Sequence, residues 1–136
     1  MSVPPSAPSM KGKVCLVTGG NSGIGKVMAA GLAKLGATTV IVCRNSERGE
    51  PALRDIMVQA GSQRVELLAA DLSSMRQVRE LAIEFRRRHE RLHVLINNAG
   101  LMPKKRQLTE DGYELQFAVN YLAPFLLTYL LLEPIV

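Results

Sequence analysis

The chain has 136 residues, 47% hydrophobic and 21% charged, which is ordinary usage for a single globular domain and excludes a disordered chain. Aromatic residues make up only 4%, and there is no tryptophan, which argues against a stacking platform for single-stranded nucleic acid. The net charge is +5, with basic runs at residues 86–88 and 104–106. We interpret both runs as solvated surface, with a nucleic-acid or anionic-lipid surface as the alternative.

The N-terminal segment, residues 1–10, contains three prolines, three serines and no charged residue. It lacks the basic segment and the apolar core of a signal peptide, so we predict a disordered leader. The longest apolar stretch, residues 122–132, is too short for a spanning helix, which needs about 20 residues. We expect neither a signal peptide nor a membrane anchor, and one domain over residues 11–136.

Segments typical of strands and of helices alternate along this domain. Short runs rich in β-branched residues predict strands, and apolar residues three and four positions apart predict helices. Gly36 and Gly61 mark the ends of the first two helices. We predict strands over residues 13–18, 38–43, 64–70 and 92–97, and helices over residues 23–35, 47–60, 74–90 and 109–132.

This βαβαβαβα order predicts an α/β fold, a doubly wound parallel sheet of Rossmann type with helices on both faces. We expect only about four strands plus a long final helix, which makes the domain an incomplete Rossmann domain. The fourth strand is then an exposed edge. The five leucines between residues 126 and 132 lack part of their packing surface, so we expect a marginal, association-prone chain.

The two cysteines, Cys15 and Cys43, fall in the first and second predicted strands. We place them about 10 Å apart along the strand direction, whereas a disulfide needs Cα atoms within about 7 Å. Two buried free thiols suit a cytoplasmic or other reducing compartment.

A glycine-rich turn, Thr-Gly-Gly-Asn-Ser-Gly-Ile-Gly over residues 18–25, joins the first strand to the first helix. Glycine permits the backbone angles of a tight turn and lets a pyrophosphate approach N–H groups at the helix N-terminus. The βαβ context favours a dinucleotide site over a turn without a ligand. The predicted contacts are Thr18, Gly19, Asn21, Ser22, Gly23, Ile24 and Gly25.

The residue after the second strand selects the cofactor in such folds. An acid about 20 residues past the glycines binds the ribose 2′-hydroxyl of NAD, whereas an arginine accommodates the 2′-phosphate of NADP. Arg44 stands 19 residues after Gly25, next to Asn45, and the nearest acid is Glu47. A guanidinium can bind a phosphate through two hydrogen bonds, so we predict NADP(H). The alternative, Arg44 as a surface residue, leaves the cofactor preference open.

The spacing Thr-Gly-x-x-x-Gly-x-Gly resembles that of the short-chain dehydrogenase/reductase family. The sequence Asn-Asn-Ala-Gly at residues 97–100, after the fourth strand, is similar to the family's second motif. The resemblance covers residues 11–136, about half of a family member. It implies an NADP(H)-dependent oxidoreductase with further cofactor contacts at Asn98, Ala99, Gly100, Asp71 and Leu72. Asp71 would meet the adenine edge; an N-cap or turn role is equally open.

The family's catalytic set is an Asn, a Ser, a Tyr and a Lys, of which only the Asn has a match, Asn120. Its backbone carbonyl holds a water in the family's proton relay. Pro124 has no N–H for that carbonyl, so we predict that the carbonyl is free and the helix kinked. The alternative is a kinked packing helix without a catalytic link. No Lys follows any tyrosine by four residues. We therefore expect this chain alone to be inactive.

The segments at residues 44–50, 108–117 and 120–128 resemble the retinol-dehydrogenase-like branch of the family, which acts on retinoids, steroids and other lipophilic alcohols and carbonyls. The resemblance implies a small-molecule substrate for the full-length form and a homo- or heterodimer through the final helix. We predict no metal site, no nucleic-acid partner and no membrane span. The alternative function is an inactive short form that binds NADP(H) or a partner protein.

Overall fold

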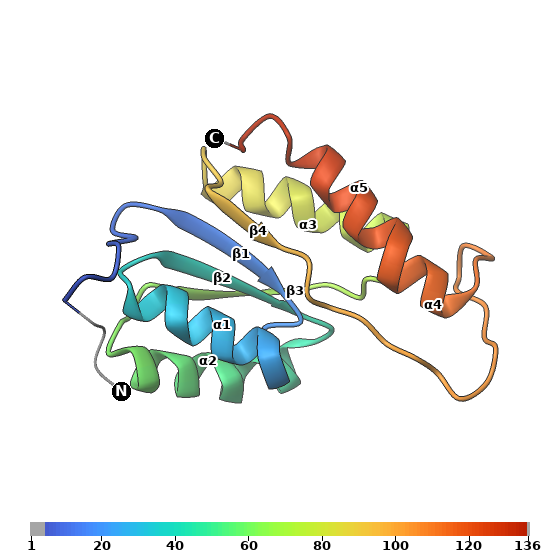
Figure 1. Ribbon diagram of the computed structural model, residues 1–136. Coiled ribbons are helices and arrows are strands. Elements are labelled where there is room, and N and C mark those ends of the chain that lie inside the picture. The colour runs from blue at the N-terminus through green and yellow to red at the C-terminus, as the bar shows by residue number, and fades with distance from the viewer. Residues whose placement is uncertain (1–4, 136) are drawn as a thin grey trace.

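The computed structural model describes residues 5–135 as a parallel sheet flanked by helices (Figure 1). The strands are β1 (Val14–Thr18), β2 (Thr38–Cys43), β3 (Val65–Ala69) and β4 (Val94–Ile96), in the order β3-β2-β1-β4. The first three are followed by α1 (Gly23–Lys34), α2 (Ser46–Ala60) and α3 (Met75–Arg88). After β4 come α4 (Leu115–Phe117), the π-helical turn η1 (Ala118–Leu122) and α5 (Ala123–Leu130). The predicted doubly wound Rossmann-type fold is confirmed.

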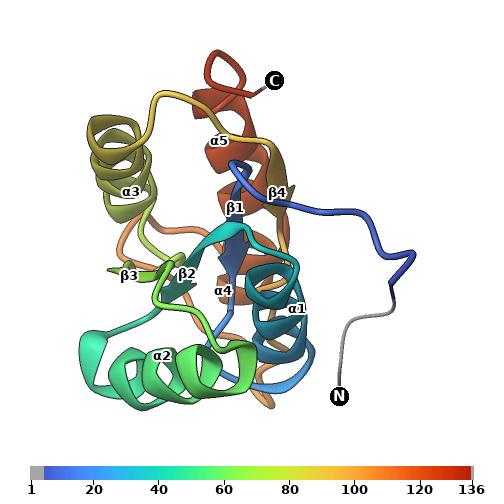
Figure 2. The ribbon, with the colours of Figure 1, turned by 90° about the vertical axis from the view of Figure 1, so that its left-hand side faces the viewer.

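Helices α1 and α2 cover one face of the sheet, and α3 and α5 cover the other (Figure 2). Alternate strand residues enter the two cores: Val17 and Ile41 pack with α1 and α2, whereas Leu16 and Val40 pack with α3 and α5. Both faces are buried, which explains why the strands are continuous apolar runs in the sequence.

The register of the sheet brings the carboxyl ends of its strands to one edge. Thr18 of β1 pairs with Val42 of β2, and Val17 pairs with Ile96 of β4. On the other side, Cys43 pairs with Ala69 of β3. The loops that follow the four strands therefore open at the same edge, where ligands bind in open α/β sheets.

The predicted start of the final helix, residue 109, is wrong. Residues 109–114 form a tight turn, in which the Thr109 N–H donates to the Tyr113 carbonyl at 2.7 Å and Gly112 has a φ of 81°. A positive φ suits glycine and ends any helical pattern. The helix begins instead at Leu115, because the Glu114 carboxylate accepts hydrogen bonds from the first two N–H groups that follow Leu115.

The final helix is interrupted at the place that Pro124 predicts. At the end of η1, the Ala123 N–H donates to the Ala118 carbonyl, five residues earlier instead of four. Proline cannot donate to the Asn120 carbonyl, so a regular α-helical bond is impossible there. The regular α-helix is thus interrupted next to Pro124. The kink, the free Asn120 carbonyl and its catalytic role stay predictions.

The prediction that the five C-terminal leucines lack part of their packing surface is wrong for two of them. Leu127 and Leu131 are fully buried in the core beneath α3 and α5. The exposed face of this helix carries aromatic side chains instead: Tyr121, Phe125 and Tyr129 are 58–65% exposed. These aromatic residues lie four apart, one helical turn from each other, and form a continuous apolar stripe.

The two thiols are free and buried, as predicted, and burial raises the pKa of both. Cys15 pairs with Thr39, so Cys43 lies four residues further along the neighbouring strand, a separation of about 13 Å instead of the predicted value of about 10 Å. Of the predicted leader, residues 1–4 lie outside the described residues. Residues 5–10 contain neither helix nor strand, and the Met10 N–H donates to the Leu35 carbonyl. Within residues 5–135, no helix has the length and apolar character that crossing a bilayer requires.

Candidate active site

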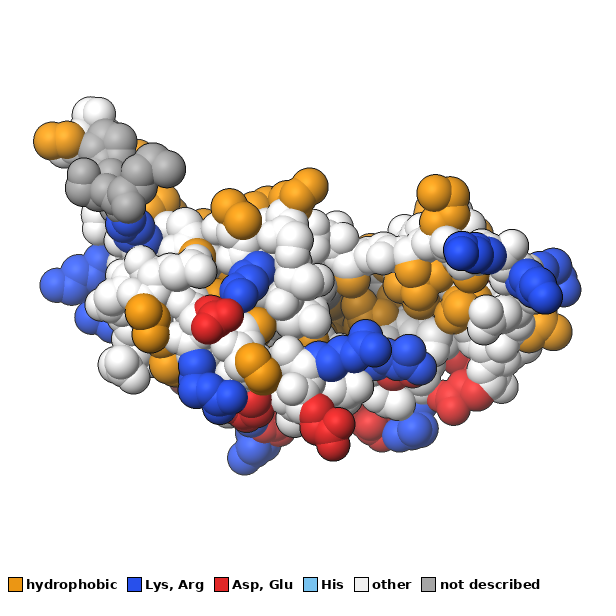
Figure 3. Space-filling model, turned by 90° about the horizontal axis from the view of Figure 1, so that it is seen from below, with side chains coloured by type: hydrophobic (Ala, Val, Ile, Leu, Met, Phe, Trp, Pro, Cys, Tyr) orange, Lys and Arg blue, Asp and Glu red, His pale blue; other side chains and the backbone are white. Residues whose placement is uncertain are grey.

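A cleft of about 670 Å³ opens at the carboxyl edge of the sheet (Figure 3). Its volume lies in the range of small-molecule sites, roughly 300–1,000 Å³. The loops after all four strands line it, together with the segment that leads to α4. The lining includes these predicted site residues: Gly19, Asn21, Ser22, Arg44, Asp71, Leu72, Asn98, Ala99 and Gly100. Thr18, Gly23, Ile24, Gly25 and Asn45 lie among the described residues but do not line the cleft.

The glycine-rich turn brings α1 very close to β1 and β4. Gly19 has a φ of 66°, in the region that favours glycine, and its N–H donates to the Val42 carbonyl at 2.8 Å. A Cβ at Gly25 would collide with the Gly19 carbonyl oxygen and the Asn98 amide nitrogen. The missing side chain of Gly25 therefore permits this close packing, and its contact with a cofactor stays a prediction.

The N-terminus of α1 lies beside the cleft, and its first N–H groups are available to bind an anion. Ser22 is the N-cap residue, and in the described structure its side chain makes no capping hydrogen bond. The first turn of the described α1 contains no acidic residue either. The first N–H groups of a helix have no partner within it, and the helix dipole favours negative charge there. This end of α1 can bind a phosphate.

Thr18 holds the ends of β1 and β4 together. It is 2% exposed, and its hydroxyl accepts hydrogen bonds from the N–H groups of Asn98 and Ala99 at 3.1 and 3.0 Å. The Asn98 side-chain amide in turn donates to the carbonyls of Thr18 and Gly19 at 3.1 and 3.3 Å. The two sequence motifs are thus joined by hydrogen bonds, and Thr18 stands behind the cleft wall instead of in it.

Arg44 and Asp71 face each other across the end of the cleft between β2 and β3. The Arg44 Nε lies 3.6 Å from the Asp71 Oδ2, and the guanidinium side chain is 70% exposed. The other carboxylate oxygen, Oδ1, accepts hydrogen bonds from the N–H and the hydroxyl of Ser73. The turn role considered for Asp71 is therefore real, whereas the N-cap of α3 is Ser74.

Asn45 has a local role that the sequence did not predict. Its side-chain oxygen accepts the Arg48 N–H at 3.0 Å and so caps α2. Arg48, on the first turn of that helix, lines the cleft in its place. The site therefore has two arginines at the β2 end, Arg44 directly after the strand and Arg48 on the first turn of α2.

Asn120 lies on η1 and contacts the backbone that follows the second motif. Its amide makes a pair of hydrogen bonds with Leu101, which lines the cleft. Asn120 itself borders a second hollow of about 430 Å³ on the aromatic side of α5, with Asn97 and Thr128. Its hydrogen bonds to Leu101 connect it to the first cleft.

A sequence model described as short chain dehydrogenase matches residues 13–136, nearly all of the domain. The chain belongs to the short-chain dehydrogenase family. Retinol dehydrogenase 13 of Mus musculus is 44% identical over 129 residues, which are 95% of this chain and 39% of the mouse protein. This family member therefore spans about two fifths of the length of the curated relatives it matches.

Solved structures agree with this assignment. An uncharacterised protein of Mycobacterium paratuberculosis is 37% identical with a TM-score of 0.84, over 96% of this chain and 46% of that one. A metagenomic short-chain oxidoreductase in complex with NADP is 33% identical with a TM-score of 0.79, over 91% of this chain and 57% of that one. The fold and the oxidoreductase family are thereby established.

The residues of the cleft fit an anionic dinucleotide. The helix terminus at Ser22 suits a pyrophosphate, Arg44 and Arg48 supply positive charge, and the volume accommodates a ligand of this size. In residues 5–135, no group of three or more His, Cys, Asp or Glu side chains could hold a metal ion.

Several lining residues carry no signal in the sequence. Ser73, Ser74, Gln77, Gln107, Leu108, Thr109, Glu110, Leu115 and Val119 all border the cleft. Residues 107–110 reach it only because the segment after β4 folds back against α3, where the Met75 N–H donates to Asp111 at 3.0 Å. Arg48 differs, because a second arginine at the start of the helix that follows Arg44 indicates further positive charge near this strand end.

Proposed function

We propose that this sequence forms the cofactor-binding part of an NADP(H)-dependent oxidoreductase, which transfers a hydride between the nicotinamide and a carbonyl or a secondary alcohol. The observation that carries the choice of NADP(H) is the pair Arg44 and Arg48 at the β2 end of the cleft. An arginine at this position accommodates a 2′-phosphate, whereas a carboxylate would repel it. The complex of a 33% identical oxidoreductase with NADP supports this choice.

Each part of the cofactor has a proposed set of contacts. The first turn of α1, with Asn21 and Ser22, binds the pyrophosphate through backbone N–H groups. Arg44 binds the 2′-phosphate, and we assign Arg48 to the same group. Asp71 accepts a hydrogen bond from the adenine amino group, next to Leu72. Asn98, Ala99 and Gly100 form the wall beneath the ribose and the nicotinamide. The bound cofactor supplies or accepts the hydride.

Asn120 has two proposed roles. Its side chain fixes Leu101 at the cleft, and its backbone carbonyl holds a water for proton transfer, as in the family. The other family residues, a Ser and the Tyr-x-x-x-Lys pair, have no match in this sequence, since no Lys stands four residues after Tyr113, Tyr121 or Tyr129. General acid–base catalysis contributes about 10²–10⁴-fold, so we expect the 136-residue chain alone to bind the cofactor without turnover.

The proposed substrate is a lipophilic alcohol or carbonyl of retinoid or steroid type, by similarity to retinol dehydrogenase 13. A second candidate function is that of an inactive module that binds NADP(H) or a partner. The exposed aromatic stripe on α5 favours it, because such a face suits association with another chain. A homo- or heterodimer through this helix is part of that proposal, as is residence in a reducing compartment.

Titration of the chain with NADPH and NADH tests the function. NADPH should bind at least tenfold more tightly, and Arg44→Ala should remove most of that preference while it leaves NADH binding unchanged. Arg64→Ala, an exposed arginine remote from the cleft, is the control. Equal affinities in the wild-type chain would refute the NADP(H) assignment, and measurable turnover of retinal by the 136-residue chain would refute its inactivity.

A further inference from the structure

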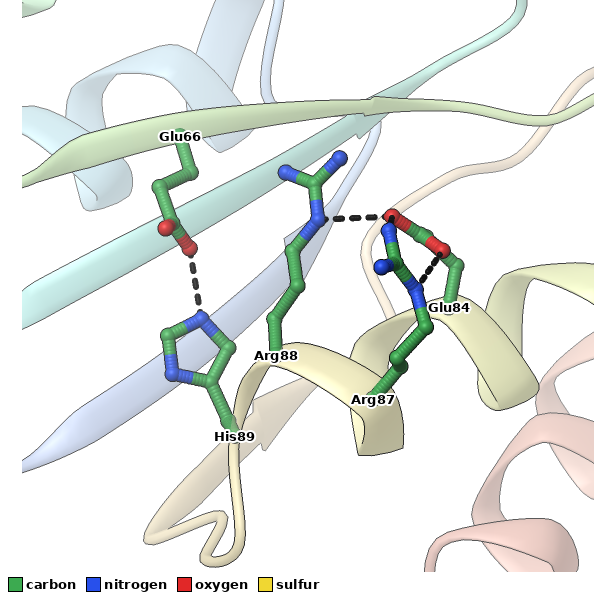
Figure 4. A network of polar contacts seen from close by, with 5 residues as sticks. All are labelled: Glu66, Glu84, Arg87, Arg88 and His89. Carbon is green, nitrogen blue, oxygen red and sulfur yellow. Dashed lines mark hydrogen bonds and ion pairs between the residues drawn. The ribbon is translucent and has the colours of Figure 1, made fainter.

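The two basic runs of the sequence have different surroundings. Residues 86–88 are paired: Arg86 Nη2 lies 2.5 Å from Glu133, and Arg87 and Arg88 each lie 2.8 Å from Glu84. Figure 4 shows the side chains of Arg87 and Arg88 both reaching the Glu84 carboxylate, and these hydrogen bonds lower the pKa of Glu84 to about 2. Much of the charge of this run is therefore balanced within the protein.

The second run, Lys104, Lys105 and Arg106, has no such balance. All three side chains are exposed, and none forms an ion pair with any residue of the described part of the chain. Residues 98–109 contain no Asp or Glu. Three positive charges thus stand together in solvent.

The acids that follow this run bind elsewhere, at the start of α3. The Ser74 hydroxyl donates to the Glu110 carboxylate, and the Met75 N–H donates to Asp111 Oδ2 at 3.0 Å. Both acids are therefore held at the N-terminus of α3, where the helix dipole favours negative charge. These contacts fix the base of the loop and leave its basic part without counter-charges.

The same loop presents aliphatic side chains to solvent. Met102 is 83% exposed, Leu108 59% and Leu101 36%. In Figure 1 the loop extends away from the sheet, and the right-hand end of Figure 3 shows Lys and Arg side chains next to hydrophobic ones. Apolar side chains on a rim of positive charge are typical of surfaces that bind a membrane interface.

We propose that residues 101–108, the basic–apolar loop, dock on the surface of an anionic phospholipid bilayer. Each Lys or Arg held near anionic headgroups strengthens binding about fivefold, so three contribute on the order of 100-fold. Met102 and Leu108 would enter the boundary between headgroups and acyl chains. Aliphatic side chains do not stack on bases, which favours a lipid over a single-stranded nucleic acid as the partner.

Docking of this loop would set the cleft against the bilayer, because Leu101, Gln107 and Leu108 also line the cleft. A lipophilic substrate could then pass from the membrane to the site without crossing water. This consequence rests on the proposed function, whereas docking itself depends only on the loop.

The test is co-sedimentation of the 136-residue chain with vesicles of phosphatidylcholine that contain about 30% phosphatidylserine. The wild-type chain should bind them and not pure phosphatidylcholine vesicles. The triple variant Lys104→Gln, Lys105→Gln, Arg106→Gln should bind at least tenfold more weakly. Met102→Ser should bind severalfold more weakly, and added salt should release the protein.

The matched control removes the same charge from the paired run: Arg86→Gln, Arg87→Gln, Arg88→Gln should bind within about twofold of wild type. If that variant does not fold, the exposed residues Lys11, Lys13 and Arg91 replace it. Equal loss in the control, equal binding to neutral vesicles, or tighter binding to single-stranded RNA than to vesicles would overturn the proposal. NADPH affinity, measured on the same variants, should not change; absence of NADPH binding would refute the proposed function and leave docking intact.

Discussion

The side chain of Asn120 clamps the backbone of Leu101 through two hydrogen bonds. The Leu101 N–H donates to the Asn120 Oδ1 at 2.9 Å, and the Asn120 Nδ2 donates to the Leu101 carbonyl at 2.8 Å. An amide is the side chain that can both donate and accept in this way. The pair links the π-helical turn to the wall of the cofactor cleft, although the two residues are 19 positions apart.

Replacement of Asn120 by Ala should therefore loosen that wall. We expect a loss of about 1 kcal/mol in the free energy of unfolding, since both bonds are exposed, and severalfold weaker NADPH binding. Urea denaturation and cofactor titration measure the two effects. Asn120→Asp keeps the acceptor and loses the donor, so it should fall between Ala and wild type. NADPH affinity that is unchanged in Asn120→Ala would mean that Leu101 needs no clamp.

Gly25 and Gly31 lie on the same helix and should respond in opposite directions to alanine. A Cβ at Gly25 would strike the Gly19 carbonyl and the Asn98 amide, so Gly25→Ala should destabilise the chain by about 1–3 kcal/mol and abolish tight NADPH binding. A Cβ at Gly31 would meet nothing within 4 Å, so Gly31→Ala should stabilise it by about 0.5–1 kcal/mol. Thermal unfolding distinguishes them, and equal shifts would contradict the close approach of α1.

The aromatic stripe should make the isolated chain associate. Phe125 and Tyr129 are 64% and 65% exposed, and the double variant Phe125→Ser, Tyr129→Ser removes most of this apolar area. We expect a shift toward monomer in sedimentation velocity. Val58→Ser, on the far face of the molecule and 83% exposed, is the control and should leave the distribution unchanged. Equal association of all three proteins would exclude the stripe as the contact.

The pairing of Glu84 with Arg87 and Arg88 predicts a dependence of stability on acid. Hydrogen bonds from the two arginines lower the pKa of Glu84 from 4.5 to about 2. A depressed folded-state pKa stabilises the fold above pH 4.5, and this contribution is lost as the pH falls toward about 2. The group is exposed, so solvent screening keeps the effect small. The urea midpoint should drop between neutral and acid pH, and this drop should be smaller in Glu84→Gln than in the wild-type chain. An equal drop in both proteins would contradict the pairing.

The sequence predicts the first three βα units well, because their periodicity, β-branched strands and terminal glycines all indicate the same elements. It fails at residues 109–114, where the prediction extends the final helix across the Asp-Gly turn at residues 111–112. At that point the turn chemistry prevents a helix. Leu127 and Leu131 were misjudged for another reason: which side of a helix is buried depends on where α3 lies, and spacing alone does not give it.

The residues of the candidate site likewise fall into those that the sequence predicts and those that it does not. Residues that follow directly after strands, such as Arg44 and Asp71, are predictable because parallel strands end at one edge. The wall from Gln107 to Glu110 is not, because it depends on contacts with α3 about 35 residues earlier. Thr18 shows a third case, since its motif position is correct while its side chain is turned inward to join two strands.

The π-helical turn acts as a one-residue insertion in the final helix. It sets the direction in which the side chains of α5 point around the helix axis. Each residue of a helix advances by about 100° around the axis. With the extra residue in place, Leu127 lies against the core while Phe125 is exposed to solvent. Deletion of one residue from Ala118–Leu122 would rotate the residues that follow by about that angle. The same eight residues of α5 would then present a different face to the sheet.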